Sequence, residues 1–235
     1  MDVSGKKAII FGGTSGIGLA AAQQLAAKGA EVVAISRNPA KAGDPGAGIR
    51  LAQCDVRDRA AMEALFAAEG PYDILISAAT GGDRAVGPFL TMDMDGFKAS
   101  FDKMWGYANV VRYGAENLAE TGCIVLVSGM PARRIKPGQI AIGSVGGAVE
   151  QFARGVAPEL APKRINVVSP GQIDTPMVTL EGEARTAHYA KTTKGHLIER
   201  AGTADEVALG IVFAVENDFI TGTTIDVDGG WYLGA

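Results

Sequence analysis

A glycine-rich turn near the start of the chain constrains the fold more than any other feature. The apolar run 7–11 leads into this turn, and an apolar, alanine-rich segment, 19–25, follows it. The order predicts a strand, a tight turn and a helix, because such a turn needs residues without a Cβ. The free N–H groups and the positive dipole end of that helix favour a pyrophosphate over an empty strand-to-helix turn. The residues expected to hold it are Gly12, Thr14, Ser15, Gly16, Ile17 and Gly18.

Strand-like apolar runs recur along the rest of the chain, with helical stretches between them. The runs are 31–36, 49–54, 73–77, 123–128, 164–168 and 223–227. Continuous apolar runs, rather than alternation, are typical of strands that are covered on both faces. The pattern predicts an α/β fold, a single doubly wound (Rossmann) domain over 1–235 with a parallel seven-stranded sheet and helices on both faces. The least regular segment, about 175–198, is expected to be a polar loop that serves as a substrate-loop lid.

Composition excludes several classes of partner. The 235 residues carry a formal net charge of −4, so the chain offers no basic patch for nucleic acid or for an anionic membrane. Cys54 and Cys123 lie in apolar runs without the spacing of metal ligands, and we expect reduced core thiols and no metal. Neither a signal peptide nor a transmembrane run is evident, which leads us to expect a cytoplasmic protein.

The end of the second predicted strand indicates which dinucleotide is bound. An Asp or Glu there accepts a hydrogen bond from a ribose 2′-hydroxyl, whereas a guanidinium can bind a 2′-phosphate. This chain has Ser36 and Arg37 and no carboxylate at that point. With Ser15 they favour NADP(H) over NAD(H), the alternative being that Arg37 is a solvated loop residue.

The spacing Gly-x-x-x-Gly-x-Gly resembles the Thr-Gly-x-x-x-Gly-x-Gly motif of the short-chain dehydrogenase/reductase family, although Phe11 stands where that family usually has Thr. The segment 169–176 is similar to the family's Pro-Gly-x-x-x-Thr segment, and Val227-Asp228-Gly229-Gly230 also fits. The resemblance covers essentially the whole chain. It implies a homo-oligomer, a tetramer or dimer, built through helices around 97–119 and 139–157.

The resemblance also implies roles for further residues at the cofactor. Asp55 and Val56 match the step that binds the adenine amino group, although Asp55 could equally cap the next helix. The run Ser77-Ala78-Ala79-Thr80-Gly81 stands where the family usually shows Asn-Asn-Ala-Gly, and the small Ala78 and Ala79 still allow close approach to the ribose. Near the nicotinamide carboxamide or the pyrophosphate, the resemblance places Pro170, Gly171, Ile173 and Thr175.

The family's Asn-Ser-Tyr-Lys tetrad has no match in this chain. Alignment of the segment 137–150 puts Ile142 at the tyrosine and Gly146 at the lysine. Counting back puts Gly129 at the serine, with Ser128 one place earlier, and the register set by Gly106 puts Lys103 at the asparagine. The loss of a positioned proton donor alone costs on the order of 10²–10⁴ in rate. The chain is therefore expected to be a divergent member.

Lys103 and Ser128 are the residues that we expect to carry catalysis. We expect Lys103 to reach into the space left at Gly146, where its ammonium would hold the ribose or polarise a substrate oxygen. The alternative is a lysine on a solvated helix face. Ser128 could donate a proton or serve only as a hydrogen bonder at a strand end.

Other polar residues are weaker candidates. Further possible proton donors are Tyr107, His188, Tyr189 and His196. A cluster of cations could bind an anionic substrate or simply be solvated, and it consists of Arg133, Arg134 and Lys136.

Three functions remain open from the sequence. The first is a divergent NADP(H)-dependent oxidoreductase that acts on a small carbonyl or alcohol without the usual Tyr-Lys pair. The second is a non-redox enzyme, a lyase or isomerase, on the same fold. The third is a nucleotide-binding pseudoenzyme that acts as a sensor or partner subunit.

Overall fold

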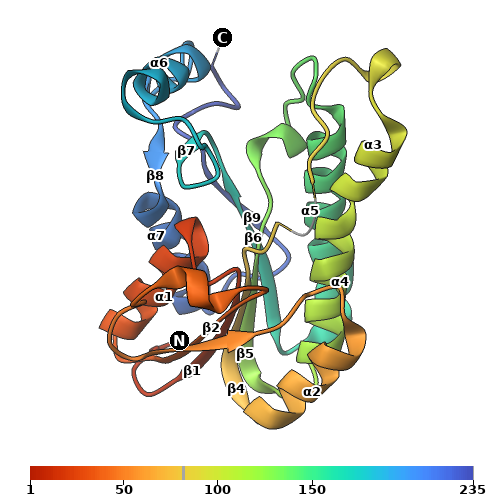
Figure 1. The fold of residues 1–235 in the computed structure, drawn as a ribbon. Helices are drawn as coiled ribbons and strands as arrows, with labels where there is room; N and C mark the ends of the chain where they lie inside the picture. The colour runs from red at the N-terminus through yellow and green to blue at the C-terminus, as the bar shows by residue number, and fades with distance from the viewer. Residues whose placement is uncertain (81–82, 235) are drawn as a thin grey trace.

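The computed structural model describes residues 1–80 and 83–234, so Gly81, which ends the run 77–81, lies outside the described residues. Its main sheet has seven strands, all paired in parallel, in the order β3-β2-β1-β4-β5-β6-β9 (Figure 1). The strands are β1 (Lys7–Phe11), β2 (Glu31–Ser36), β3 (Ile49–Gln53), β4 (Tyr72–Ser77), β5 (Leu118–Val127), β6 (Arg164–Pro170) and β9 (Thr224–Val227). The predicted doubly wound fold is confirmed.

Helices cover both faces of this sheet (Figure 1). They are α1 (Gly16–Ala27), α2 (Arg59–Glu69), α3 (Met94–Ser100), α4 (Asp102–Gly114), α5 (Ile140–Leu160), α6 (Gly182–Thr192) and α7 (Ala204–Glu216). One apolar core lies between the sheet and α1 with α7, and the other lies between the sheet and α2, α4 and α5. Every strand in the middle of the sheet is thus buried on both faces, which explains its continuous apolar sequence.

The order of the strands reverses between β1 and β4, and the glycine turn lies at this switch point. Gly12 has φ +75°, and a Cβ on it would lie 2.7 Å from the backbone of Ala78. A Cβ on Gly18 would lie 2.1 Å from the carbonyl oxygen of Gly12. Gly12 is therefore required for the turn to fit against the end of β4, and Gly18 for the start of α1 to pack against Gly12.

Two features depart from the sequence prediction. The segment 175–198, predicted to be an irregular polar loop, contains the helix α6. Its one buried helical residue is Tyr189, so its sequence has almost no apolar face to signal a helix. A second, two-stranded parallel sheet pairs β7 (Ile173–Asp174) with β8 (Gly202–Thr203). These strands are too short to show a period.

The two cysteines are buried and unpaired, as the sequence predicts. The N-terminal amine of Met1 lies against the end of α7, where it donates to the carbonyl oxygen of Glu216. Among the described residues, no helix combines the length and the apolar character needed to cross a membrane.

Candidate functional site

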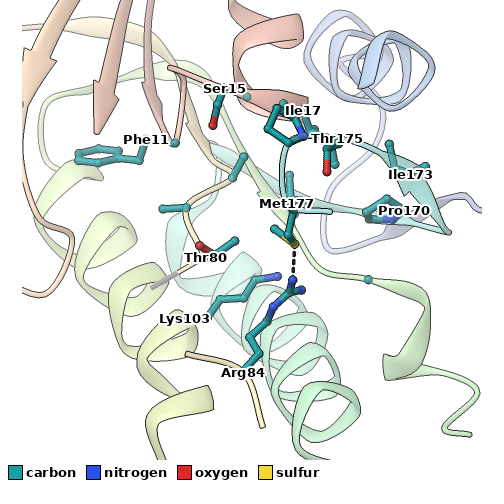
Figure 2. A pocket seen from close by; sticks show the side chains of 18 of the residues that line it. Phe11, Ser15, Ile17, Thr80, Arg84, Lys103, Pro170, Ile173, Thr175 and Met177 are labelled. Atoms are coloured by element: carbon teal, nitrogen blue, oxygen red, sulfur yellow. Dashed lines mark hydrogen bonds between the residues drawn. The ribbon is translucent and has the colours of Figure 1, made fainter. Parts of the chain in front are cut away.

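A cavity of about 670 Å³ opens at the carboxyl ends of the central strands (Figure 2). It is where a doubly wound sheet places its ligand. Every residue that the sequence assigned to the cofactor lines this cavity, and so do Lys103 and Ser128. The structure therefore brings the predicted site residues together, from segments that lie up to 163 positions apart, Gly12 to Thr175.

The glycine turn presents unpaired polar groups to the cavity. Ser15 is the N-cap of α1 with extended backbone, and its side chain forms no capping hydrogen bond within the described chain. The first turn of α1 contains no acidic residue. Its N–H groups and positive dipole end, together with the Ser15 hydroxyl, suit a phosphate.

The end of β2 also suits an anion. The Ser36 hydroxyl oxygen is buried and has no hydrogen-bond partner among the described residues. Arg37 is exposed beside it, and Gln53 fixes the Arg37 backbone by donating to its carbonyl oxygen at 3.0 Å. A buried polar atom without a partner points to a missing ligand atom. The residues present therefore fit a 2′-phosphorylated dinucleotide.

Asp55 does not cap the following helix. The N-cap of α2 is Asp58, whose side chain accepts from the Ala61 N–H at 3.0 Å. The Asp55 carboxylate instead pairs with Arg57 at 3.0 Å, and this hydrogen-bonded guanidinium lowers the pKa of Asp55. The alternative role as a helix cap is wrong, and the carboxylate lines the cavity.

The segment after β6 closes the cavity on the side of α6. The Gly171 N–H donates to the carbonyl oxygen of Val227 at 3.0 Å, which fixes the start of the segment. Arg185 of α6 pairs with Asp174 and donates to the carbonyl oxygen of Thr175 at 3.0 Å. The segment 170–175 is thus tied to β9 at one end and to α6 at the other.

Lys103 enters the cavity from α4 rather than lying on a solvated face. Its Nζ donates to the carbonyl oxygen of Ser128 at 3.1 Å and lies 5.5 Å from the centre of the Tyr107 ring. Burial, with a smaller contribution from the positive charge of Arg84, lowers the pKa of Lys103 to about 7. A lysine with this pKa exchanges its proton near neutral pH.

The expectation that Lys103 fills the space at Gly146 is wrong. A Cβ on Gly146 would lie 2.9 Å from the Ala132 Cβ and 3.2 Å from the Ser128 hydroxyl, so that space is already occupied. Gly146 also does not line the cavity, whereas Ile142, the residue aligned with the family tyrosine, does. Lys103 ends instead at the strand end, on the Ser128 carbonyl.

The Ser128 side chain points toward α5. Its hydroxyl lies 3.2 Å from the Gly146 carbonyl oxygen and 3.3 Å from the Glu150 carboxylate. Glu150 is buried and pairs with Arg133, which also pairs with Asp226 at 3.0 Å. The geometry fits the alternative that the Ser128 hydroxyl is a hydrogen bonder at a strand end. The Ser128 carbonyl, rather than its hydroxyl, contacts Lys103 in the cavity.

The weaker donor candidates do not line the cavity. Tyr107 is buried with its hydroxyl donating to the Val127 carbonyl oxygen at 3.0 Å, and burial raises its pKa. The His188 ring packs edge-on against Tyr189, whose hydroxyl lies 3.5 Å from the Ile173 carbonyl oxygen. His196 packs edge-on against Trp231, and burial lowers its pKa.

The three cations that could have bound an anionic substrate or been solvated have other partners in the structure. Arg133 is paired with two carboxylates, as described above. Arg134 donates to the carbonyl oxygens of Trp231 and Gly234, and Lys136 lies 3.3 Å from the centre of the Trp231 ring. None of the three lines the cavity.

Sequence reasoning missed Arg84. It lies in the irregular segment between β4 and α3, and the structure places its side chain in the cavity beside Lys103 (Figure 2). No motif or period marks this position. Only the course of the chain after β4 brings Arg84 to α4.

The switch-point cavity, with its glycine turn and its unpaired Ser36, defines a nucleotide-binding protein of the doubly wound class. Comparison with known proteins agrees. The family model described as enoyl-(acyl carrier protein) reductase matches residues 12–232. A 3-oxoacyl-[acyl-carrier-protein] reductase of Mus musculus is 31% identical, over 97% of this chain and 98% of the relative.

Solved structures are similar over the whole chain. One is described as a small-chain dehydrogenase in complex with NADPH, with a TM-score of 0.85, 30% identity and coverage of 98% of this chain and 100% of that one. Another, described as a short chain dehydrogenase/reductase family protein, has a TM-score of 0.85, 32% identity and 99% coverage of both chains. The chain belongs to the short-chain dehydrogenase/reductase family.

Proposed function

We propose that this protein is an NADP(H)-dependent oxidoreductase that reduces a small carbonyl compound, or oxidises the corresponding alcohol. The observation that carries the proposal is the cavity itself, where the glycine turn and the unpaired Ser36 hydroxyl with Arg37 offer two separate anion sites. Their separation on two strands suits a pyrophosphate and a 2′-phosphate. The similar structure described as a complex with NADPH supports the same cofactor.

Different residues around the cavity would bind the two ends of the cofactor and supply the proton. The glycine turn, Ser36 and Arg37 would hold the phosphates, and the segment 170–175 would hold the nicotinamide end. When bound, the reduced nicotinamide supplies a hydride to the carbonyl carbon. The carbonyl oxygen then takes up a proton, and we assign this proton to the Lys103 ammonium, which the Ser128 carbonyl holds at the strand end.

Lys103 suits this role better than the other polar groups of the cavity. A general acid works best when its pKa lies near the working pH, and the pKa of Lys103 is about 7. Ile142, at the position aligned with the family tyrosine, offers no proton. The proposal therefore assigns to α4 the proton transfer that the family carries on the helix around 142.

The test uses NADPH deuterated at C4, on each face in turn, with the purified protein and a soluble metabolite extract. Deuterium in a product above the control without protein establishes a reductase and identifies its substrate by mass spectrometry. With that substrate, Lys103→Met should lower kcat by about 10²–10⁴. Absence of label despite NADPH binding would favour a lyase or isomerase on this fold, or a nucleotide-binding pseudoenzyme.

A further inference from the structure

Two cationic side chains face the cavity from the wall opposite the glycine turn. Figure 2 shows Arg84 and Lys103 side by side, with Ser15 and Ile17 across the cavity from them. In the described part of the chain, neither cation forms a salt bridge. Their polar contacts are the Ser128 carbonyl oxygen for Lys103 and the Met177 sulfur for Arg84.

Hydrogen bonds hold the backbone that directly follows Arg84. The N–H of Ala85 donates to the hydroxyl of the buried Ser100 at 2.9 Å, and that hydroxyl donates in turn to the Gly96 carbonyl oxygen. The N–H of Gly87 donates to the carbonyl oxygen of Gly138 at 2.9 Å. The segment that follows Arg84 is therefore held in place, and the Arg84 guanidinium itself contacts the Met177 sulfur.

This pair of cations has no anionic partner among the described residues. A guanidinium has five N–H donors and no acceptor, and a thioether sulfur is a weak acceptor, so most of the hydrogen-bonding capacity of Arg84 is unused. Two adjacent positive charges also repel each other, and this repulsion contributes to the lowered pKa of Lys103. A bound anion removes both costs, because it accepts hydrogen bonds from the two side chains and compensates their charge.

The cofactor phosphates do not account for this pair. The pyrophosphate belongs at the glycine turn before α1, and the 2′-phosphate belongs at Ser36 and Arg37 after β2. Arg84 and Lys103 come from the other side of the sheet, from the segment before α3 and from α4. The cavity is also lined by the apolar residues Met130, Ile142 and Met177, and Figure 2 shows the polar Thr80 near Lys103.

We propose that Arg84 and Lys103 bind the carboxylate of the substrate, which makes this protein a reductase of small oxo acids. Arg84 binds the carboxylate by its paired N–H donors, and Lys103 lies between the carboxylate and the carbonyl oxygen that is reduced. The hydride goes to the carbonyl carbon, the proton from Lys103 goes to the oxygen, and a hydroxy acid and the oxidised nicotinamide result. This assignment rests on the proposed function.

The test compares matched acids and esters, because these differ in charge but keep the same carbonyl. Calorimetry on the protein saturated with NADP⁺ measures binding of acetoacetate against methyl acetoacetate and of pyruvate against methyl pyruvate. We expect at least one acid to bind about tenfold more tightly than its ester, as charge-assisted hydrogen bonds imply. Arg84→Gln should remove that preference.

Arg154→Gln is the matched control, because Arg154 is an exposed arginine of α5 that does not line the cavity. It should keep the preference for the acid. Unchanged NADPH binding by both variants shows that they are folded. Equal binding of every acid and its ester, or a preference that survives Arg84→Gln, overturns the proposal. Tighter binding of inorganic phosphate than of any carboxylate overturns the assignment to a carboxylate.

Binding and turnover separate this inference from the proposed function. If the acids bind with the expected preference but no hydride reaches them or any compound of the extract, the anion site stands and the reductase does not. If neutral ketones are reduced as fast as the acids and bind as tightly, the reductase stands and the anion site does not.

Discussion

At the scale of single residues, the neighbours of Lys103 change the pKa of its ammonium. The centre of the Tyr107 ring of the same helix lies 5.5 Å from the Lys103 Nζ, the Ser128 carbonyl accepts from that Nζ, and Arg84 faces it from the segment before α3. The removal of water and the nearby positive charge both disfavour the ammonium. An ordinary lysine thereby becomes a group that titrates near pH 7.

This environment predicts the pH dependence of reduction. In the proposed mechanism the protonated Lys103 supplies the proton, so kcat/KM should fall as the pH rises through about 7, the pKa of Lys103 in the free protein. Arg84→Gln removes one neighbouring positive charge and should move the break to higher pH. Steady-state kinetics from pH 5.5 to 9 with the substrate found by deuterium transfer measure both. If the Lys103→Met variant shows the same fall in kcat/KM near pH 7, that fall belongs to another group.

A second prediction about a single residue is that Arg37 determines the preference for NADPH over NADH. Arg37→Asp places a carboxylate where the guanidinium would bind a 2′-phosphate, so the Kd for NADPH should rise at least tenfold. Binding of NADH should improve, since a carboxylate accepts from the 2′-hydroxyl. Fluorescence titration with both cofactors measures the change. Arg154→Asp is the control, and equal losses in the two variants would contradict the assigned role.

At the scale of elements, a charged network fixes α5 to the end of β5. Glu150 of α5 is buried between the Ser128 hydroxyl and Arg133, and Arg133 continues the network to Asp226 of β9. The carboxylate depends on this partner because burial removes most of its water. The network also positions Ser128, whose carbonyl holds Lys103.

Removal of the arginine should therefore destabilise the fold. Arg133→Leu leaves the Glu150 carboxylate buried without its cation, and we expect a loss of about 1–3 kcal/mol in the free energy of unfolding. Urea denaturation measures it. Arg154→Leu removes an arginine from the exposed side of α5, the helix that carries Glu150, and should change stability by less than about 0.5 kcal/mol. Similar losses in both variants would show that the network contributes little.

The elements around 170–203 show where sequence patterns fail. The strands β7 and β8 pair over two residues each, and α6 buries little of its surface. Both exist because tertiary contacts stabilise them, among them the pairing of Arg185 with Asp174. Periodicity needs a longer apolar face than either element has.

At the scale of the whole molecule, α4 exposes one large aromatic side chain that fits the predicted homo-oligomer. Trp105 on α4 keeps 65% of its surface exposed. The resemblance to the family implies subunit contacts through the helices around 97–119 and 139–157, and an exposed tryptophan is typical of such contacts.

The corresponding prediction is a tetramer or dimer in solution that depends on this surface. Light scattering coupled to gel filtration should give a mass well above the 24.2 kDa of one chain. Trp105→Glu should shift the protein toward smaller species, since a buried unpaired charge opposes association. Phe219→Glu alters an exposed aromatic residue outside α4 and α5 and is the control. A monomer in every case would contradict the prediction.

The sequence by itself determined the sheet, the switch-point turn and a large part of the residues that line the cavity. Long apolar runs and glycines at positive φ are local requirements, so they can be seen without coordinates. The predicted cofactor residues lie at the carboxyl ends of strands or in the segments that follow them, which parallel pairing brings to one edge of the sheet.

Only the tertiary structure decided how the polar groups of that cavity are used. Lys103 was predicted to fill the space at Gly146, but Ala132 and Ser128 already occupy it. The cluster of cations that could have bound an anion has other partners, and Arg84, which no pattern marks, faces the cavity instead. The physical reason is that side-chain direction, desolvation and charge pairing depend on contacts between segments distant in the sequence.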